Sequence, residues 1–210
     1  ILTGLAIREQ DTSDMAAMAF DRMLFDGHPY SRPADGYVET IEQITQKDLV
    51  EFHRAHYGPR GMVIAIVGAI DPKKAVDAVS RFLGGWQVPS QVRANEMPPH
   101  KPVKKTIRHH HTLAGKSQSD LVIGMVGPQR NSPEYMPASL GNSVLGQFGM
   151  MGRIGEVVRE KSGLAYYASS SMGAGIGPGS WEVNAGVNPK NLKKAIDLIE
   201  KELHRFVKDG

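Results

Sequence analysis

Two segments of the chain show the same order of local signals, and that order is typical of a fold that mixes strands and helices. The apolar run Met62–Val67 precedes Asp71-Pro72 and a helical pattern, and a second strand pattern precedes Asn188-Pro189 and another helical pattern. An Asp or Asn residue caps a helix well, and proline suits its first turn. The residues after the two prolines are offset by three positions, so the similarity is local and does not establish an internal duplication.

Other patterns along the chain extend this organisation. Apolar spacing and caps predict helices over residues 15–25, 45–57, 72–83, 132–145, 153–161 and 189–206, and strands over residues 62–67, 104–111, 118–126, 164–172 and 179–187. We therefore expect an α+β fold of two layered units, each an antiparallel-rich sheet covered by helices. The first unit is predicted over residues 1–90, as the C-terminal part of one α+β module, and the second over residues 104–210, as the N-terminal part of another.

A basic, proline-rich segment separates these two units. Residues 91–103 contain Pro98, Pro99 and Pro102, which prevent a regular helix, so we expect a solvated linker there. The chain has 210 residues, of which 25 are basic and 22 acidic, giving a formal net charge of +3. This small excess, with no aromatic residue in the basic stretch 93–108, argues against a nucleic-acid partner.

Composition also limits the chemistry that the chain can perform. It contains no cysteine, which excludes disulfides, thiolate metal ligands and cysteine nucleophiles. No apolar run reaches the roughly 18–20 residues that span a membrane, and the first residues do not resemble a signal peptide. A chain without cysteine suits the bacterial cytoplasm and the periplasm equally. Because the sequence does not begin with Met, we expect it to be part of a longer protein.

Two histidine clusters are candidate metal ligands. His53 and His56 lie three residues apart on a predicted helix, a spacing that brings two ligands to one face but leaves the third to be supplied. His109–His111 lie on a predicted strand, where alternate residues point to opposite faces, so at most two of them converge. We assign no metal ligand in this chain.

The glycine-rich and serine-rich segments do not match known catalytic motifs. Neither G-x-x-x-x-G-K-[ST] nor G-x-G-x-x-G follows a predicted strand. The segment Gly173–Pro178 joins two predicted strands, which favours a hairpin. Ser169–Ser171 lack the G-x-S-x-G elbow of a hydrolase nucleophile. We therefore assign no catalytic residue.

One pair of hydrogen-bond donors lies at a predicted corner. Arg159 is near the end of a helix that Gly163 terminates, and Tyr166 begins the next strand. A guanidinium and a phenol are donors suited to a carbonyl or carboxylate oxygen. Considered alone, the commoner explanation is a surface arginine beside a half-buried tyrosine.

Four segments, in this order, resemble the pitrilysin/insulinase-type zinc peptidases, which include the mitochondrial processing peptidases and their bacterial relatives. The segments are His28-Pro-Tyr-Ser-Arg-Pro, Ile44-Thr-Gln-Lys-Asp-Leu-Val-Glu-Phe-His-Arg-Ala-His-Tyr, Val63-Ile-Ala-Ile-Val-Gly-Ala-Ile-Asp-Pro and Val158-Arg-Glu-Lys-Ser-Gly-Leu-Ala-Tyr. The resemblance covers nearly the whole chain, and the last segment is its most specific part. It implies tandem α+β modules of the LuxS/processing-peptidase type that form half of a clamshell around an unfolded peptide.

The resemblance also implies where the zinc chemistry lies. The family's active centre is an H-x-x-E-H motif with a downstream Glu ligand, and no H-x-x-E-H occurs in this sequence. In one register the position of the downstream ligand falls on Gly4 or Leu5, which cannot bind zinc, and in another it falls on Glu9. We expect no cofactor in this chain, with zinc held by an upstream region or by a catalytic partner. By itself the chain is expected to bind no stoichiometric zinc and to cleave no peptide.

Arg159 and Tyr166 match the family's Arg/Tyr pair, which holds the substrate near the scissile carbonyl. The resemblance therefore implies a substrate-binding, non-zinc portion of a peptidase, or of its non-catalytic partner subunit, in a homodimer or heterodimer. The strand over residues 164–172 offers an edge for an extended peptide. The alternative is a purely structural assembly subunit of the same fold, like the core proteins of a respiratory complex.

Overall fold

The computed structural model describes residues 1–92 and 96–209. The chain divides into two compact units, one made of Ile1–Val38 with Met97–Gly210 and the other of Glu39–Glu96. The prediction of an α+β fold is confirmed. The module boundaries at 1–90 and 104–210 stay a prediction, and residues 93–95 of the predicted linker lie outside the described part of the chain.

The described elements follow one another in a simple order. They are α1 (Leu2–Arg8), α2 (Thr12–Leu24), η1 (Pro29–Ser31), α3 (Val38–Ile41), α4 (Gln46–His56), α5 (Pro72–Leu83), β1 (Ser119–Val126), α6 (Tyr135–Asn142), η2 (Ser143–Gln147), η3 (Gly149–Met151), α7 (Arg153–Gly155), η4 (Glu156–Glu160), β2 (Ala165–Ala174), β3 (Pro178–Val187), η5 (Pro189–Asn191) and α8 (Leu192–Asp209). Segments η2 and η4 are π-helices, and η1, η3 and η5 are 3₁₀-helices.

A three-stranded antiparallel sheet of order β1-β3-β2 forms the centre of the first unit. Leu121 of β1 and Ala168 of β2 both pair with Ala185 of β3. The β2–β3 hairpin is the antiparallel pair that the sequence predicts around Gly173–Pro178, and it leaves β2 as one edge of the sheet.

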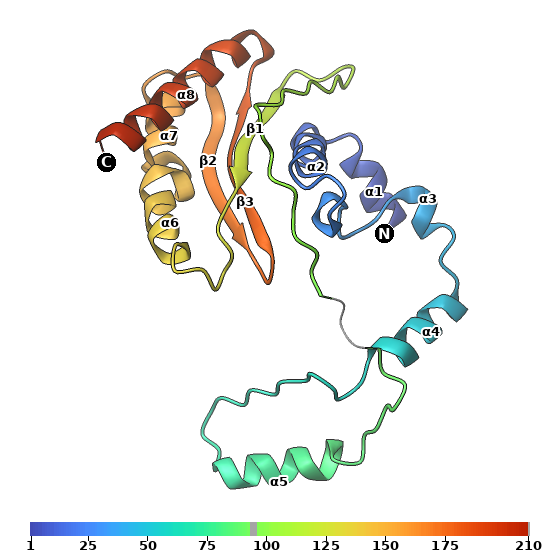
Figure 1. Ribbon diagram of the computed structural model, residues 1–210. Coiled ribbons are helices and arrows are strands. Elements are labelled where there is room, and N and C mark those ends of the chain that lie inside the picture. The colour runs from blue at the N-terminus through green and yellow to red at the C-terminus, as the bar shows by residue number, and fades with distance from the viewer. Residues whose placement is uncertain (93–95, 210) are drawn as a thin grey trace. The chain divides into compact units, whose positions relative to one another are not determined.

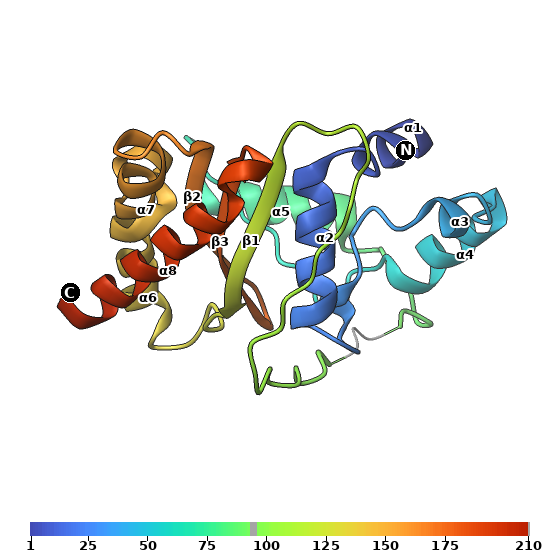
Figure 2. The ribbon, with the colours of Figure 1, turned by 90° about the horizontal axis from the view of Figure 1, so that it is seen from above.

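Helices cover both faces of this sheet. Figures 1 and 2 show α6, α7 and α8 on one face and α2 on the other. On the first face, Leu121 belongs to a buried core that includes Ile154 and Ile199. On the second face, the next residue of β1, Val122, packs against Phe20 of α2. Strand alternation therefore gives β1 one apolar surface for each layer.

Local sequence explains the bounds of α2. The Asp11 side chain accepts hydrogen bonds from the backbone N–H groups of Ser13 and Asp14, each at 2.9 Å, which satisfies two otherwise free donors of the first turn. After Leu24 the chain turns away at Gly27, whose φ of 73° is a conformation that favours glycine.

The second unit consists of capped helices joined by extended segments. Thr45 and Asp48 form a capping box at the start of α4, and Asp71 caps α5 by accepting from the Lys74 N–H at 3.0 Å. Both helices begin where the sequence predicts. The backbone N–H of Val92 donates to the Ala55 carbonyl at 2.7 Å, which ties the end of this unit to α4.

Two predicted strands are wrong for the described structure. Residues 62–67 and 104–111 form no ladder with any described strand, and Val67 is 98% exposed. A strand is stable only when a neighbour satisfies its backbone hydrogen bonds and covers its apolar face. The predicted first unit, residues 1–90, therefore contains no described strand, contrary to the expectation of a sheet in each predicted unit.

Candidate substrate-binding site

A tight corner between η4 and β2 positions the two predicted binding residues. The N–H of Gly163 donates to the Arg159 carbonyl at 2.8 Å, and the N–H of Leu164 donates to the Val158 carbonyl at 3.1 Å. Gly163 has a φ of 60°, which a side chain would strain. The backbone thus reverses within a few residues and places Arg159 and Tyr166 on its two sides.

Both binding residues occupy unusual backbone segments. Arg159 lies in the π-helix η4, a rare conformation that recurs at functional sites. The register of β2 against β3 shifts between Ala165 and Tyr167, so Tyr166 lies at a β-bulge, which re-aims side chains. Tyr166 is 60% exposed, and Arg159 is half-buried. Within residues 1–92 and 96–209, neither side chain makes a hydrogen bond or ion pair, so no described residue satisfies their donors.

Buried side chains and the ion pairs of a buried carboxylate hold the corner between η4 and β2 in place. Val158 and Ile154 are fully buried, and behind them the Glu202 carboxylate accepts from Arg153 Nε at 2.6 Å and from Arg205 at 2.9 Å. The Arg153 guanidinium also lies over the Phe206 ring, 5.0 Å from its centroid. These contacts fasten α7 to α8 and so fix the helix that carries Arg159.

Glycines in the segment before the corner permit close backbone packing, which explains their density better than a phosphate loop. A Cβ on Gly146 would lie 2.8 Å from the Ser170 nitrogen of β2, and one on Gly155 would lie 2.1 Å from the Gly149 carbonyl oxygen. Only glycine admits such approaches. The segment therefore seats η2, η3 and α7 directly on β2.

Sequence reasoning missed a polar cluster beside Tyr166. The Tyr167 hydroxyl donates to Asp120 Oδ1 at 2.5 Å, and Thr12 and Gln118 also donate to this carboxylate. Burial, followed by the hydrogen bond to Asp120, raises the pKa of Tyr167 to about 12. The cluster joins α2 to two strands, and its residues are too far apart in the chain for any local pattern to reveal it. Two adjacent tyrosines thus differ: Tyr167 is held internally, and Tyr166 is free.

The His-Pro-Tyr segment, residues 28–30, connects two distant parts of the chain through hydrogen bonds, and we call it the His-Pro-Tyr bracket. His28 is 3% exposed; its Nδ1 accepts from the Tyr30 N–H at 3.2 Å, and its Nε2 lies 3.0 Å from the Pro98 carbonyl oxygen. This pattern requires the neutral tautomer with the proton on Nε2. The Tyr30 hydroxyl in turn accepts from the Gly177 N–H at 3.3 Å, which holds the β2–β3 turn.

The side chains present do not fit zinc. Among the described residues, no three His, Cys, Asp or Glu side chains lie close enough to bind a metal ion. Glu9 is exposed at the end of α1. His53 and His56 stack on Tyr57 and Phe52 at centroid distances of 5.1 and 4.4 Å, and His109–His111 are exposed outside any strand. The described side chains therefore form no zinc site.

A pair of carboxylates lies between α2 and the sheet. Asp21 faces Glu182 of β3, and burial, followed by the charge of Glu182, raises the pKa of Asp21 to about 6. Glu182 accepts from the Ser171 hydroxyl at 3.2 Å. The folded state therefore holds a proton on Asp21 at a pH at which the unfolded chain has released it.

We expect this pair to make stability fall as the pH rises from about 4 to about 6, because the unfolded state binds fewer protons in that window. Asp21→Asn should remove this loss and raise the free energy of unfolding by about 1 kcal/mol at pH 7.5, since Asp21 is only partly buried and solvent screens its charge. Thermal denaturation between pH 4 and pH 8 measures the effect, with exposed Asp26→Asn as the control. An unchanged pH dependence in the Asp21 variant would contradict this account.

The layered sheet, the His-Pro-Tyr bracket and the Arg159–Tyr166 corner together make an α+β module of the zinc-peptidase type. Residues 43–210 match the family model described as Peptidase M16 inactive domain, and the chain belongs to this family as an inactive, non-catalytic domain. The predicted family is confirmed.

Similar proteins support this membership. An uncharacterized zinc protease of Mycobacterium leprae is 27% identical over 213 residues, which cover 100% of this chain and 47% of that protein. The crystal structure of a peptidase M16 inactive domain from Pseudomonas fluorescens matches with a TM-score of 0.89 and 26% identity, over 100% of this chain and 50% of that one. A chain of complex III2 from Candida albicans, 19% identical, shares the fold with a TM-score of 0.77, over 97% of this chain and 49% of that one. The chain thus spans about half the length of the curated relatives it matches. No described helix has the length and apolar character needed to cross a membrane.

Proposed function

We propose that this chain is the substrate-holding, non-zinc part of an M16 peptidase or of its non-catalytic partner subunit. In this proposal Arg159 and Tyr166 donate hydrogen bonds to a backbone carbonyl of an unfolded peptide near the bond to be cut. A catalytic region or partner subunit, in a homodimer or heterodimer, holds the zinc. The observation that carries the proposal is the pair's placement: a π-helix and a β-bulge carry two donors that no other described residue uses.

The chemistry follows from what such donors do to a carbonyl under attack. The arginine is a fixed cation and the tyrosine a neutral donor, and both are anchored by backbone that packs on a buried core. Donors positioned in advance stabilise the negative charge that develops on the carbonyl oxygen. Within the described sheet β2 is an edge strand, a position at which an extended peptide can add as a further strand. The catalytic partner supplies the zinc and the water, and this chain supplies orientation.

The test replaces each donor in the complete natural protein with its catalytic partner present. We expect Arg159→Ala and Tyr166→Phe each to lower kcat/KM for peptide hydrolysis by about 100-fold, which corresponds to about 3 kcal/mol of transition-state stabilisation. Because both donors act on one carbonyl, the double variant should lose less than the sum of the two single losses. Thermal denaturation measured in parallel should show little change.

Matched controls separate this role from general damage. Arg22→Ala removes an exposed arginine of α2, and Tyr167→Phe removes the neighbouring hydroxyl that bonds Asp120. Arg22→Ala should change neither activity nor stability, whereas Tyr167→Phe should reduce stability and leave the donor pair intact. Wild-type turnover in the Arg159 and Tyr166 variants would reject substrate holding and favour a purely structural assembly subunit.

A further inference from the structure

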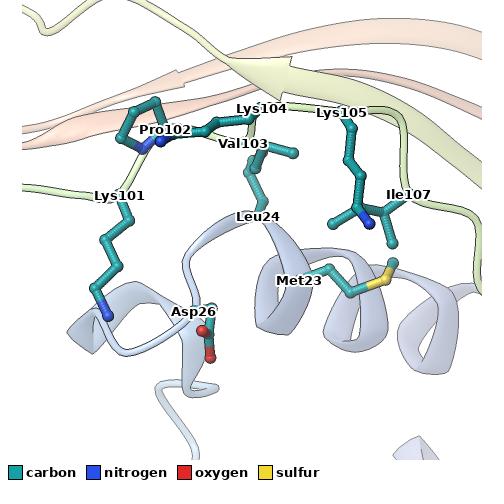
Figure 3. A pocket seen from close by; sticks show the side chains of 9 residues that line it. All are labelled: Met23, Leu24, Asp26, Lys101, Pro102, Val103, Lys104, Lys105 and Ile107. Carbon is teal, nitrogen blue, oxygen red and sulfur yellow. The ribbon is translucent and has the colours of Figure 1, made fainter.

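A groove in the first unit lies between the end of α2 and the segment 101–107 (Figure 3). Its lining residues are far in sequence from the Arg159–Tyr166 corner. Its volume is about 440 Å³, which falls within the range of sites that take a ligand. Met23 and Leu24 line it from the helix, and Val103 and Ile107 line it from the segment. The groove therefore has an apolar lining on both sides.

The apolar side chains that the segment contributes to the groove are only half-buried. Leu24 is 6% exposed, but Val103 is 43% exposed and Ile107 is 49% exposed. In Figure 3, Lys105 and Ile107 extend from the segment toward the side of Met23. A large apolar side chain placed here would gain contact with residues on both walls while removing Val103 and Ile107 from water.

Positive charge surrounds this apolar lining. Lys101, Lys104 and Lys105 border the groove, against the single carboxylate of Asp26. In the described part of the chain, none of the three ammonium groups forms an ion pair. The groove thus presents cations without internal partners, which favours a ligand that carries negative charge.

The backbone of the segment is also available. Residues 101–107 form no helix and, within the described residues, make no ladder with any strand, and the chain bends at Lys105. An extended backbone with free N–H and C=O groups can accept another strand. In such a pairing Val103, Lys105 and Ile107 share one side of the segment and Lys104 takes the other, so apolar residues of the added strand can face α2 while acidic residues on its other side reach Lys104.

We propose that this groove binds an extended peptide segment in which acidic side chains alternate with large apolar ones. The ligand adds to residues 101–107 as a strand, its apolar side chains contact Met23, Val103 and Ile107, and the positive charge of Lys101, Lys104 and Lys105 attracts its carboxylates. The proposal goes beyond the holding of a scissile carbonyl, because binding here does not use Arg159 or Tyr166.

The test measures fluorescence anisotropy of a labelled peptide of alternating Glu and Leu residues with the complete natural protein. Lys104→Glu combined with Lys105→Glu should weaken binding by about tenfold or more, since two attractive contacts become repulsive. The control pair, Lys193→Glu with Lys194→Glu, makes the same charge change on exposed positions of α8 and should bind as the wild type does. Arg159→Ala should also leave this affinity unchanged.

Two further peptides test charge recognition and strand addition separately. A peptide with Lys in place of Glu should bind at least about tenfold more weakly, and one with N-methylated backbone amides should lose the strand pairing and bind weakly as well. Equal affinities for the Lys104/Lys105 and Lys193/Lys194 variants would overturn the site, as would equal affinities for the Glu and Lys peptides. Undiminished binding of the N-methylated peptide would overturn strand addition.

Discussion

Glu202→Gln should lower the free energy of unfolding by about 3 kcal/mol, because it leaves two arginines facing a neutral amide in a largely buried place. Glu202 is 4% exposed and accepts from Arg153 at 2.6 Å and from Arg205 at 2.9 Å. The side chain of Arg153 is only 18% exposed, so water replaces little of the lost interaction. Urea denaturation at pH 7, followed by circular dichroism, measures the change.

The neighbouring residue Glu200 provides a matched comparison on the same helix. Its ion pair with Arg108 is 3.6 Å long, and the two side chains are 47% and 82% exposed. Exposed pairs of this kind contribute about 0–1 kcal/mol, so Glu200→Gln should leave the urea midpoint almost unchanged. If the two variants lost similar amounts of stability, burial would not explain the strength of the Glu202 interaction.

The second large effect concerns Gly155, which a larger residue cannot replace without moving the backbone. Gly155→Ala would place a Cβ 2.1 Å from the Gly149 carbonyl oxygen, and backbone cannot rotate away as a side chain can. We expect a loss of about 3 kcal/mol in the free energy of unfolding, at the upper end for overpacking. Thermal or urea denaturation of the purified variant measures it.

Gly4→Ala is the control, because it makes the same chemical change in a helix with open space around it. Apart from its chain neighbours and the backbone of its own helix, no described atom lies within 4 Å of a Cβ at this position, so the higher helix propensity of alanine should raise stability by up to about 1 kcal/mol. The two substitutions are therefore expected to have opposite signs. A stabilising Gly155→Ala would show that the η3–α7 segment is looser than its contacts indicate.

Local sequence signals predict those parts of the fold that local interactions determine. Thr45 with Asp48, and Asp71 before Pro72, mark the starts of α4 and α5 because the caps bond to backbone only two or three residues away. The β2–β3 hairpin is predicted for the same reason, since its strands are joined by a short turn. The segment 62–67 has the composition of a strand, but composition does not supply the neighbouring strand that it requires.

Local sequence signals predict only part of the candidate site. Arg159 and Tyr166 emerge from a family resemblance, and their spacing across Gly163 predicts the corner that joins them. The β-bulge at Tyr166 depends on the register against β3, and the π-helix at Arg159 depends on packing against β2 and α8, neither of which a local pattern contains. The Tyr167–Asp120 bond joins residues 47 positions apart and has no sequence signature.

The attachment of α2 to the sheet has a consequence for the order of events during synthesis. Part of the packing of Phe20 and Leu24 comes from Val122 and Val126, and Thr12 reaches Asp120 across 108 positions of the chain. At about 5–20 residues per second, a ribosome needs about 5–20 s after α2 has been made to synthesise β1. During that interval the apolar side of the helix is open to water and to other nascent chains.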